Sequence, residues 1–181
     1  MTSPDPVTQA AAYQRSLLDA LGDDDPAAAM AETPAILRAL FADAGDDLRT
    51  RPEAREWSVL QVAGHIADAE LVVAGRLRWI LAHDRPEILP YDQDLWVDTL
   101  HVDDDPAALL AGFETLRQAN LNLWQRTPIE ERSRVGIHRE RGEESFELTF
   151  RLLAGHDRVH VAQARRALES LRAGRGAGAA F

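Results

Sequence analysis

Apolar residues recur every three to four positions over most of the chain, the spacing of helices that bury one face. A short helix is predicted over residues 11–22, closed by Gly22. Four further segments keep the period long enough to predict long helices: 34–49, 59–83, 106–127 and 145–174. No strand–helix–strand rhythm, glycine-rich phosphate loop or heptad run accompanies them. The pattern therefore predicts an all-α protein, a four-helix bundle with a short extra N-terminal helix.

The predicted helix starts share one capping device. The hexapeptide DDDPAA occurs at 23–28 and again at 103–108, and in each copy an Asp N-cap precedes a Pro at the first helical position. We attribute the repeat to this shared cap chemistry rather than to a duplication. Thr33 and Pro34 predict another helix start of the same kind, and Ser58 caps the following helix.

The segments between the long helices set the expected connections. Residues 84–104 lack sustained periodicity and are interpreted as a long crossover between long helices 2 and 3. Residues 128–144 are polar and are interpreted as a loop with one short strand-like piece. We predict a single domain over 11–173, with a flexible N-terminus at 1–10 and a flexible Gly/Ala tail at 174–181.

Composition narrows the classes of function. The 181 residues contain no cysteine, which excludes disulfides, thiolate metal ligands and a cysteine nucleophile. With 30 acidic and 20 basic residues the net charge is -10, so no basic footprint exists for nucleic acid. No apolar run approaches a membrane span and the first residues do not form a signal peptide, which predicts a cytoplasmic protein that engages no membrane.

Three histidines fall on predicted buried faces. His156 and His160 are four residues apart on the apolar stripe of the last helix, where their side chains can meet. His65 lies on the buried stripe of the helix that Ser58 caps. The residues leave two hypotheses open: satisfied core histidines, or an open site for a divalent metal ion, zinc or nickel, whose shell water completes.

Four polar residues on or near these faces are candidates for supporting the ligands or lining a substrate pocket. Asp68 could accept a hydrogen bond from a ligand imidazole, or could be an ordinary surface carboxylate. Arg117 could bind a substrate carboxylate or simply pair with an acid of the protein. Arg76 and Gln163 are pocket candidates on the same two helices as the histidines.

The remaining histidines and Trp57 are expected to have structural or surface roles. His83 and His101 are expected at a helix end or on the surface. His138 lies in the polar loop, where a solvated role is the default unless the loop folds over a site. Trp57 is interpreted as the hydrophobic staple that precedes the Ser58 cap.

Two motifs carry a resemblance to a known family. EWSVLQVAGHIADAE at 56–70 resembles the signature that surrounds the first histidine of the DinB/YfiT-like proteins. AGHDRVHVAQARR at 154–166 resembles the closing motif of that family, and the order of the segments matches from about residue 12 to 171. The one departure is Ala164, where the family motif has Ile or Leu, and it leaves the histidines unchanged.

This resemblance implies a four-helix bundle of up-down-down-up topology in which His65, His156 and His160 hold a divalent metal. It also implies a homodimer, and it suggests the transfer of a low-molecular-weight thiol to a small electrophilic substrate. Since the chain has no cysteine, the sulfur would come from the cosubstrate. A metal-dependent hydrolase and a non-catalytic, stress-associated metal-binding dimer are the alternatives. The last alternative is a purely structural bundle in which all three histidines form hydrogen bonds within the core.

Overall fold

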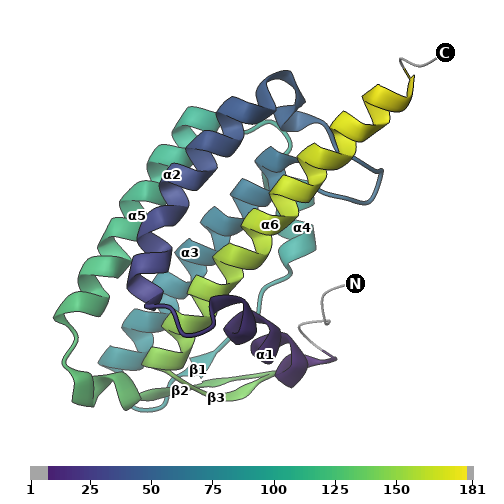
Figure 1. Ribbon diagram of the computed structural model, residues 1–181. Helices are drawn as coiled ribbons and strands as arrows, with labels where there is room; N and C mark the ends of the chain where they lie inside the picture. Colours follow the sequence, from purple (N-terminus) through teal and green to yellow (C-terminus); the bar gives the residue numbers. More distant parts are fainter. Residues whose placement is uncertain (1–7, 179–181) are drawn as a thin grey trace.

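The computed structural model describes residues 8–178 and shows a bundle of long helices with a small sheet at one end (Figure 1). Its elements, in chain order, are α1 (Ala10–Leu21), α2 (Pro26–Ala44), the 3-10 helix η1 (Gly45–Arg49), α3 (Val59–Ala82), β1 (Glu87–Ile88), α4 (Gln93–Leu100), α5 (Pro106–Arg126), the 3-10 helix η2 (Ile129–Ser133), β2 (Val135–His138), β3 (Gly142–Ser145) and α6 (Phe146–Gly178). Helices α2, α3, α5 and α6 are the four long helices of the bundle.

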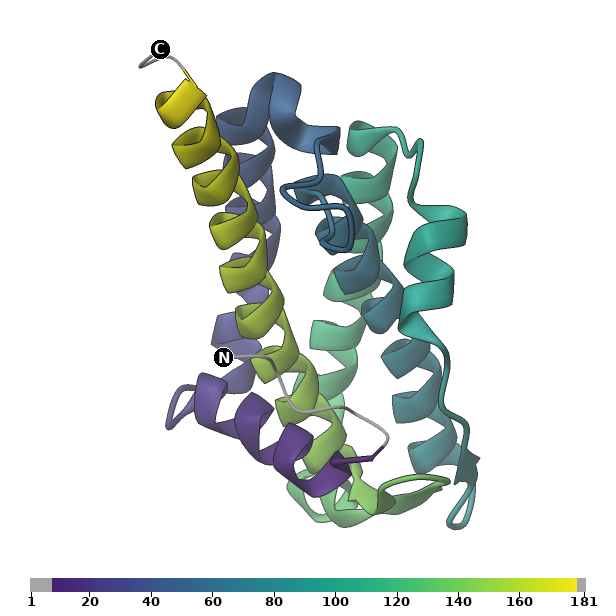
Figure 2. The ribbon, with the colours of Figure 1, turned by 90° about the vertical axis from the view of Figure 1, so that its right-hand side faces the viewer.

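The direction of the four helices is up for α2, down for α3, down for α5 and up for α6 (Figure 1). Each helix packs against two neighbours, in the pairs α3–α6, α2–α6, α2–α5 and α3–α5. Two of these pairs are therefore parallel and two are antiparallel. The expected up-down-down-up bundle is confirmed. Helix α1 packs against α6 near the sheet end, and α4 packs along α3 (Figure 2).

Side-chain caps fix where the helices begin. Ser58 accepts a hydrogen bond from the backbone N–H of Gln61, and the Gln61 side chain accepts from the backbone N–H of Ser58, which completes a capping box for α3. Asp25 and Asp105 cap α2 and α5 by accepting from the backbone N–H groups of Ala28 and Ala108, each with Pro at the next position. The predicted capping role of both hexapeptides is confirmed.

The predicted helix start at Thr33 and Pro34 is wrong, because α2 begins at Pro26 and runs through both residues. Proline inside a helix removes the N–H that would bond the carbonyl four residues earlier, which here is that of Met30. Arg117 donates to the Met30 carbonyl instead, at 2.7 Å. The Thr33 hydroxyl does not cap but donates to Asp157, also at 2.7 Å. Bonds from neighbouring helices thus let α2 continue through its proline.

The segments interpreted as a crossover and a loop contain more regular structure than predicted. The crossover includes α4, whose N-cap Asp92 accepts from the N–H of Leu95, and the strand β1. The polar loop forms β2 and β3, which pair antiparallel, while β1 pairs parallel to β2. These elements are too short to show a hydrophobic period, which is why the sequence pattern did not predict them.

The predicted flexible ends are only partly within the described residues. Helix α1 begins at Ala10, as expected within one residue, while residues 1–7 lie outside the described part. The predicted helix end at Gly174 is wrong, because α6 continues through it to Gly178. The last three residues of the expected tail, 179–181, lie outside the described part.

Two apolar clusters form the core, with a polar layer between them along each long helix. In α6 the layer falls between Ala154 in the first cluster and Val161 in the second. In α5 it falls between Leu121 and Phe113. This polar layer holds the buried ion pairs of Arg117 and the three histidines His65, His156 and His160 described below. Within residues 8–178, no helix is both long and apolar enough to cross a membrane.

Candidate metal centre

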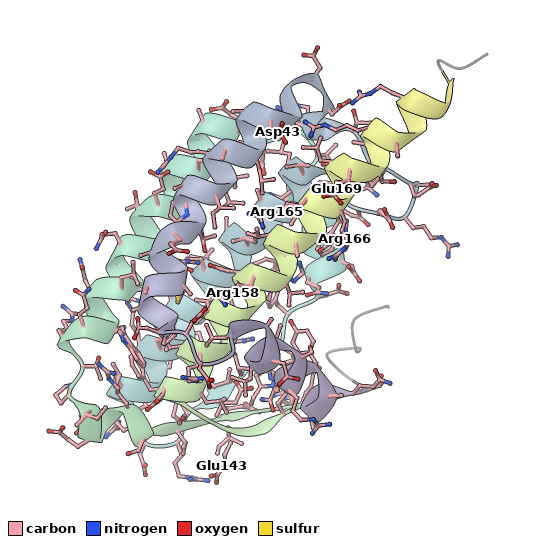
Figure 3. The ribbon with its side chains drawn as sticks, viewed as in Figure 1. Asp43, Glu143, Arg158, Arg165, Arg166 and Glu169 are labelled. Atoms are coloured by element: carbon pink, nitrogen blue, oxygen red, sulfur yellow. The ribbon has the colours of Figure 1, made fainter. Side chains whose placement is uncertain are left out.

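The three histidines predicted from the sequence lie together in the interior of the bundle. His65 of α3 and His156 and His160 of α6 are each less than a tenth exposed. Their Nε2 atoms face one another: His65 Nε2 lies 2.8 Å from His156 Nε2 and 3.2 Å from His160 Nε2. The charged residues Arg165, Arg166 and Glu169, by contrast, occupy the exposed outer side of α6 (Figure 3).

Burial keeps these imidazoles neutral. It is the largest cause that lowers the pKa of His65 and His156 well below the ordinary value, and the neighbouring imidazoles lower both further. Burial also lowers the pKa of His160 to about 4, against an opposing hydrogen bond to Gln163. A neutral imidazole offers a lone pair on one ring nitrogen, which is the form that binds metal ions.

The geometry of the three nitrogens fits a metal ion. Tetrahedral zinc with Zn–N bonds of about 2.0–2.1 Å places its nitrogen ligands roughly 3.3 Å apart, close to the two separations at His65. Gln163 Oε1 lies 2.8 Å from His160 Nδ1, where it can only accept, so the ring proton sits on Nδ1 and the lone pair on Nε2. No carboxylate is in hydrogen-bond contact with any of the three rings among the described residues. The group is therefore built from nitrogen ligands alone.

Trp57 covers one side of the histidine cluster. Its ring centroid lies 5.0 Å from that of His65, and its ring stacks toward His160 at 6.3 Å. The same side chain packs on the second apolar cluster beside the start of α3, which agrees with the predicted staple. Trp57 thus joins the cap of α3 to the wall of the site.

A cavity of about 450 Å³ adjoins the cluster on the side of the sheet, within the range of small-molecule pockets. His156 is one of its lining residues, so the cluster opens toward it. The wall also includes the hydroxyls of Tyr13, Tyr91 and Thr149, the cations Arg76 and Arg141, and further polar side chains: Gln14, Asp92, Gln93, Asp94, Glu140 and Glu144. Arg76, a candidate from the sequence, thus lies in the wall of this cavity, and its role toward a substrate stays a prediction.

Asp68 serves a different imidazole from the one expected. Its carboxylate lies 2.8 Å from Nε2 of His101, and Asp104 lies 2.5 Å from Nδ1 of the same ring. Hydrogen bonds to both carboxylates raise the pKa of His101 against the effect of its burial. The ring fits against α3 because Gly64 has no side chain, and a Cβ there would lie 2.3 Å from the His101 ring. The structure thus corrects one expectation, because Asp68 contacts no cluster histidine among the described residues. His101 lies at a helix end, as one of its two expected roles required, since it is the C-cap of α4, but it is buried there.

Arg117 lies outside the pocket wall and pairs with acids of the protein, the second of the two roles considered. It is 1% exposed and forms ion pairs with Glu70 and Asp157 at 2.7 and 2.6 Å. Asn120 also donates to Glu70, at 2.8 Å. These residues join α3, α5 and α6, and the bond from Arg117 to Met30 adds α2.

His138 is buried, not solvated. It lies on β2 and its Nδ1 accepts from the backbone N–H of Glu140 at 3.2 Å. Burial and the nearby charge of Arg141 lower its pKa to about 4. Of the two roles considered, the loop folding inward is the one observed, although His138 does not line the cavity.

Sequence reasoning missed several residues of this region. Tyr13 and Tyr91 of the cavity wall come from α1 and from the segment before α4, neither of which the helical pattern connects to the site. Asp157 was not among the sequence candidates, yet it is 2% exposed. Its position beside His156 was the available signal, because a residue next to a buried histidine can still face a second neighbouring helix.

The fold and the histidine cluster define a four-helix-bundle protein with a candidate metal centre in its core. The model of the DinB superfamily matches residues 29–164, about three quarters of the chain. The chain therefore belongs to the DinB superfamily.

Similar proteins carry provisional names of one kind. A protein of Geobacillus thermodenitrificans, provisionally named a metal-dependent hydrolase, is 38% identical over 73 residues, which are 40% of this chain and 41% of that protein. A Bacillus cereus protein with the same provisional name is 27% identical over 106 residues, or 59% of this chain and 61% of that one. The matched regions thus span less than two thirds of either relative.

The fold has a solved counterpart in YfiT from Bacillus subtilis, described, again provisionally, as a metal-dependent hydrolase with an unusual four-helix bundle topology. The TM-score is 0.73, and the match covers 96% of this chain and 94% of that one. At 21% sequence identity, this likeness speaks for the fold alone.

Proposed function

We propose that this protein is a metal-dependent hydrolase in which His65, His156 and His160 hold one divalent metal ion. The observation that carries the proposal is the convergence of three buried Nε2 atoms from two helices, at 2.8 and 3.2 Å. Three imidazole ligands with an adjoining cavity fit an open, catalytic type of site better than a closed structural one. The provisional names of the relatives support the same class of reaction.

Imidazole ligands suit zinc and nickel, and we propose one of these two as the native metal. Bound there, the metal ion would supply Lewis acidity, which lowers the pKa of water and polarises a carbonyl group. The chain supplies the rest of the site. Gln163 orients the His160 ring, Trp57 shields the cluster, and the cavity holds the substrate beside His156.

Two of the neutral hydroxyls in the cavity wall, those of Tyr91 and Thr149, can orient a substrate. Burial raises the pKa of Tyr91 above its ordinary value, so this phenol stays protonated and can donate a hydrogen bond. The Thr149 hydroxyl is buried and lacks a hydrogen-bond partner within the described residues. Both groups can therefore bond a substrate without adding charge to the site.

Thiol transfer uses the same site with a different nucleophile and remains the alternative to hydrolysis. The chain contains no cysteine, so the thiol would have to enter as a cosubstrate. The homodimer, the stress association and the cytoplasmic location implied at the level of sequence stay predictions.

A panel of small esters and amides, assayed with metal-stripped and with zinc- or nickel-reloaded protein, tests the proposal. We expect hydrolysis by the reloaded protein that is lost on stripping and absent from a His156→Ala, His160→Ala variant. Parallel reactions of an electrophile with and without a small thiol separate the two reactions. A thiol adduct formed only with reloaded protein, without hydrolysis of any panel member, would replace hydrolase by transferase.

A further inference from the structure

Arg76 is a buried cation without an acidic partner at the wall of the cavity. Its residue is 6% exposed, and it lies on α3 among the lining residues. The only hydrogen bond of its guanidinium within the described residues runs from Nη2 to the carbonyl of Leu89, at 2.8 Å. Its Nε atom is buried and has no partner there. No carboxylate of the described chain forms an ion pair with it.

Burying Arg76 in this way costs free energy unless an anion pairs with it, because a buried ion without a partner loses its hydration without compensation. Arg117, which is also buried, shows how this fold treats a structural arginine: two carboxylates flank it. The nearest inner acid of the cavity is already engaged. Glu144 accepts from Arg141 at 2.5 and 3.1 Å and from Gln14 at 2.7 Å.

The other acids of the cavity lie at its rim. Asp92, Asp94 and Glu140 are exposed, where water screens their charges, and Asp92 is occupied in capping α4. Arginine keeps its charge even where burial and Arg141 lower its pKa, as they do for Arg76. The inner wall therefore presents a positive charge with free N–H donors, in the fork geometry that fits a carboxylate.

The surface between Arg76 and the histidine cluster is apolar. His65, Ala69, Val73 and Arg76 follow one another at helical spacing along the inner stripe of α3, and the last three line the cavity. Eleven residues of helix separate His65 from Arg76, a rise of about 16 Å between their Cα atoms.

We propose that the cavity binds an organic substrate carrying a carboxylate, which Arg76 receives, with an apolar segment along Ala69 and Val73 and its reactive group toward His156. This inference rests on the proposed function, since it takes the cavity to be the substrate pocket of the metal centre. It names a class of substrate, an apolar carboxylic acid with a hydrolysable bond at the end remote from its carboxylate.

Binding of two matched probes to the metal-free protein, measured by calorimetry, tests the inference without catalysis. Octanoate and octanamide share a chain length and differ in charge. We expect octanoate to bind at least about tenfold more tightly, as hydrogen bonds to a charged group predict. Metal-free protein is used because a carboxylate can also bind a metal ion directly.

Three variants locate the charge that is responsible. Arg76→Gln should reduce the affinity for octanoate about tenfold or more and leave that for octanamide unchanged, while Arg76→Lys should keep part of the preference. Arg78→Gln is the matched control, because Arg78 is exposed two residues further along α3 and does not line the cavity. Its affinity for octanoate should equal that of the wild type.

Equal binding of the two probes to wild-type protein would overturn the inference, whatever the variants do. So would unchanged octanoate binding by a folded Arg76→Gln protein, with folding checked by circular dichroism. If Arg76→Gln does not fold, the preference of the wild type for octanoate decides. Loss of the octanoate preference alongside intact metal-dependent hydrolysis would reject this inference alone, and carboxylate binding without metal binding would reject the proposed hydrolase alone.

Discussion

Two groups of buried polar side chains lie next to each other in this bundle. They differ in whether the protein itself supplies charged partners for them. In the Arg117 network, one guanidinium lies between the carboxylates of Glu70 and Asp157 and also donates to the carbonyl of Met30, so its charge is paired by contacts across four helices. In the histidine cluster, three imidazoles face each other without a carboxylate in contact. His156 and Asp157 are consecutive in sequence, yet each belongs to a different group.

The difference separates a structural role from a ligand-binding role. A buried cation that is paired with two carboxylates of the protein needs no ligand to compensate its charge, and these bonds hold the helices in place. Among the described residues, the three Nε2 atoms of the cluster can form hydrogen bonds only with one another, and all three can bind the same partner only when a cation enters. We therefore read the Arg117 network as the support that positions α6, and the cluster as the site it positions.

The largest expected effect on the unfolding free energy comes from replacing Arg117. Arg117→Met leaves two buried carboxylates without their cation, which we expect to cost about 3–5 kcal/mol of unfolding free energy. Denaturant unfolding followed by circular dichroism measures it. Arg38→Met is the control: Arg38 pairs with Glu114 on the surface, and its loss should cost less than about 1 kcal/mol. Equal costs for both variants would remove the distinction between a buried network and a surface pair.

A smaller effect is expected from pH on the metal-free protein. The pKa of His160 is about 4 in the folded chain against an ordinary 6.5, so the unfolded chain binds more protons between these values. The unfolding free energy should therefore fall as pH drops from about 6.5 toward 4, by roughly 2–3 kcal/mol for this residue. The double variant His156→Leu, His160→Leu should show a shallower loss over that window. The pH dependence of the unfolding free energy that remains in this variant includes the contribution of His138, whose pKa is also lowered to about 4.

Removing the partner of His160 should weaken the site without dismantling it. Gln163→Leu deletes the acceptor that fixes the ring proton on Nδ1. We expect metal affinity to fall about 10- to 100-fold, the range found when partners of ligand histidines are removed. Competition with a chelating indicator measures the change. Glu169→Leu, on the exposed side of the same helix, is the control and should leave the affinity as it is.

The smallest expected change sharpens the comparison most. At pH 7.5 and without metal, His156→Leu should alter the unfolding free energy by less than about 1 kcal/mol, because the histidine contributes no ion pair and its Nδ1 has no partner among the described residues. His65 retains His160 as a neighbour. A loss as large as that of Arg117→Met would show that the cluster, too, is a structural network.

The parts predictable from sequence were those that repeat a local pattern. Helix starts could be predicted because capping depends on a few consecutive residues, as at Asp25, Ser58 and Asp105. His65, His156 and His160 could be paired across helices because each falls on a buried stripe of a long helix. The family motifs added the topology, which periodicity alone does not give.

The parts that could not be predicted depend on contacts between distant segments. Pro34 would end an isolated helix, and Arg117, on another helix, donates to the Met30 carbonyl that the proline leaves without its helical partner. The partner of Asp68 is His101 from a segment without helical period. The cavity wall likewise needs Tyr13 and Tyr91, whose places follow from how α1 and the crossover fold back.

The metal content of protein purified without a polyhistidine tag tests the central claim most directly. We predict close to one divalent metal ion per chain in the wild type, zinc or nickel by elemental analysis. The folded His156→Ala, His160→Ala variant should hold almost none. Little metal in the wild type after incubation with zinc or nickel, or equal metal in the variant, would contradict the assignment of these histidines as ligands.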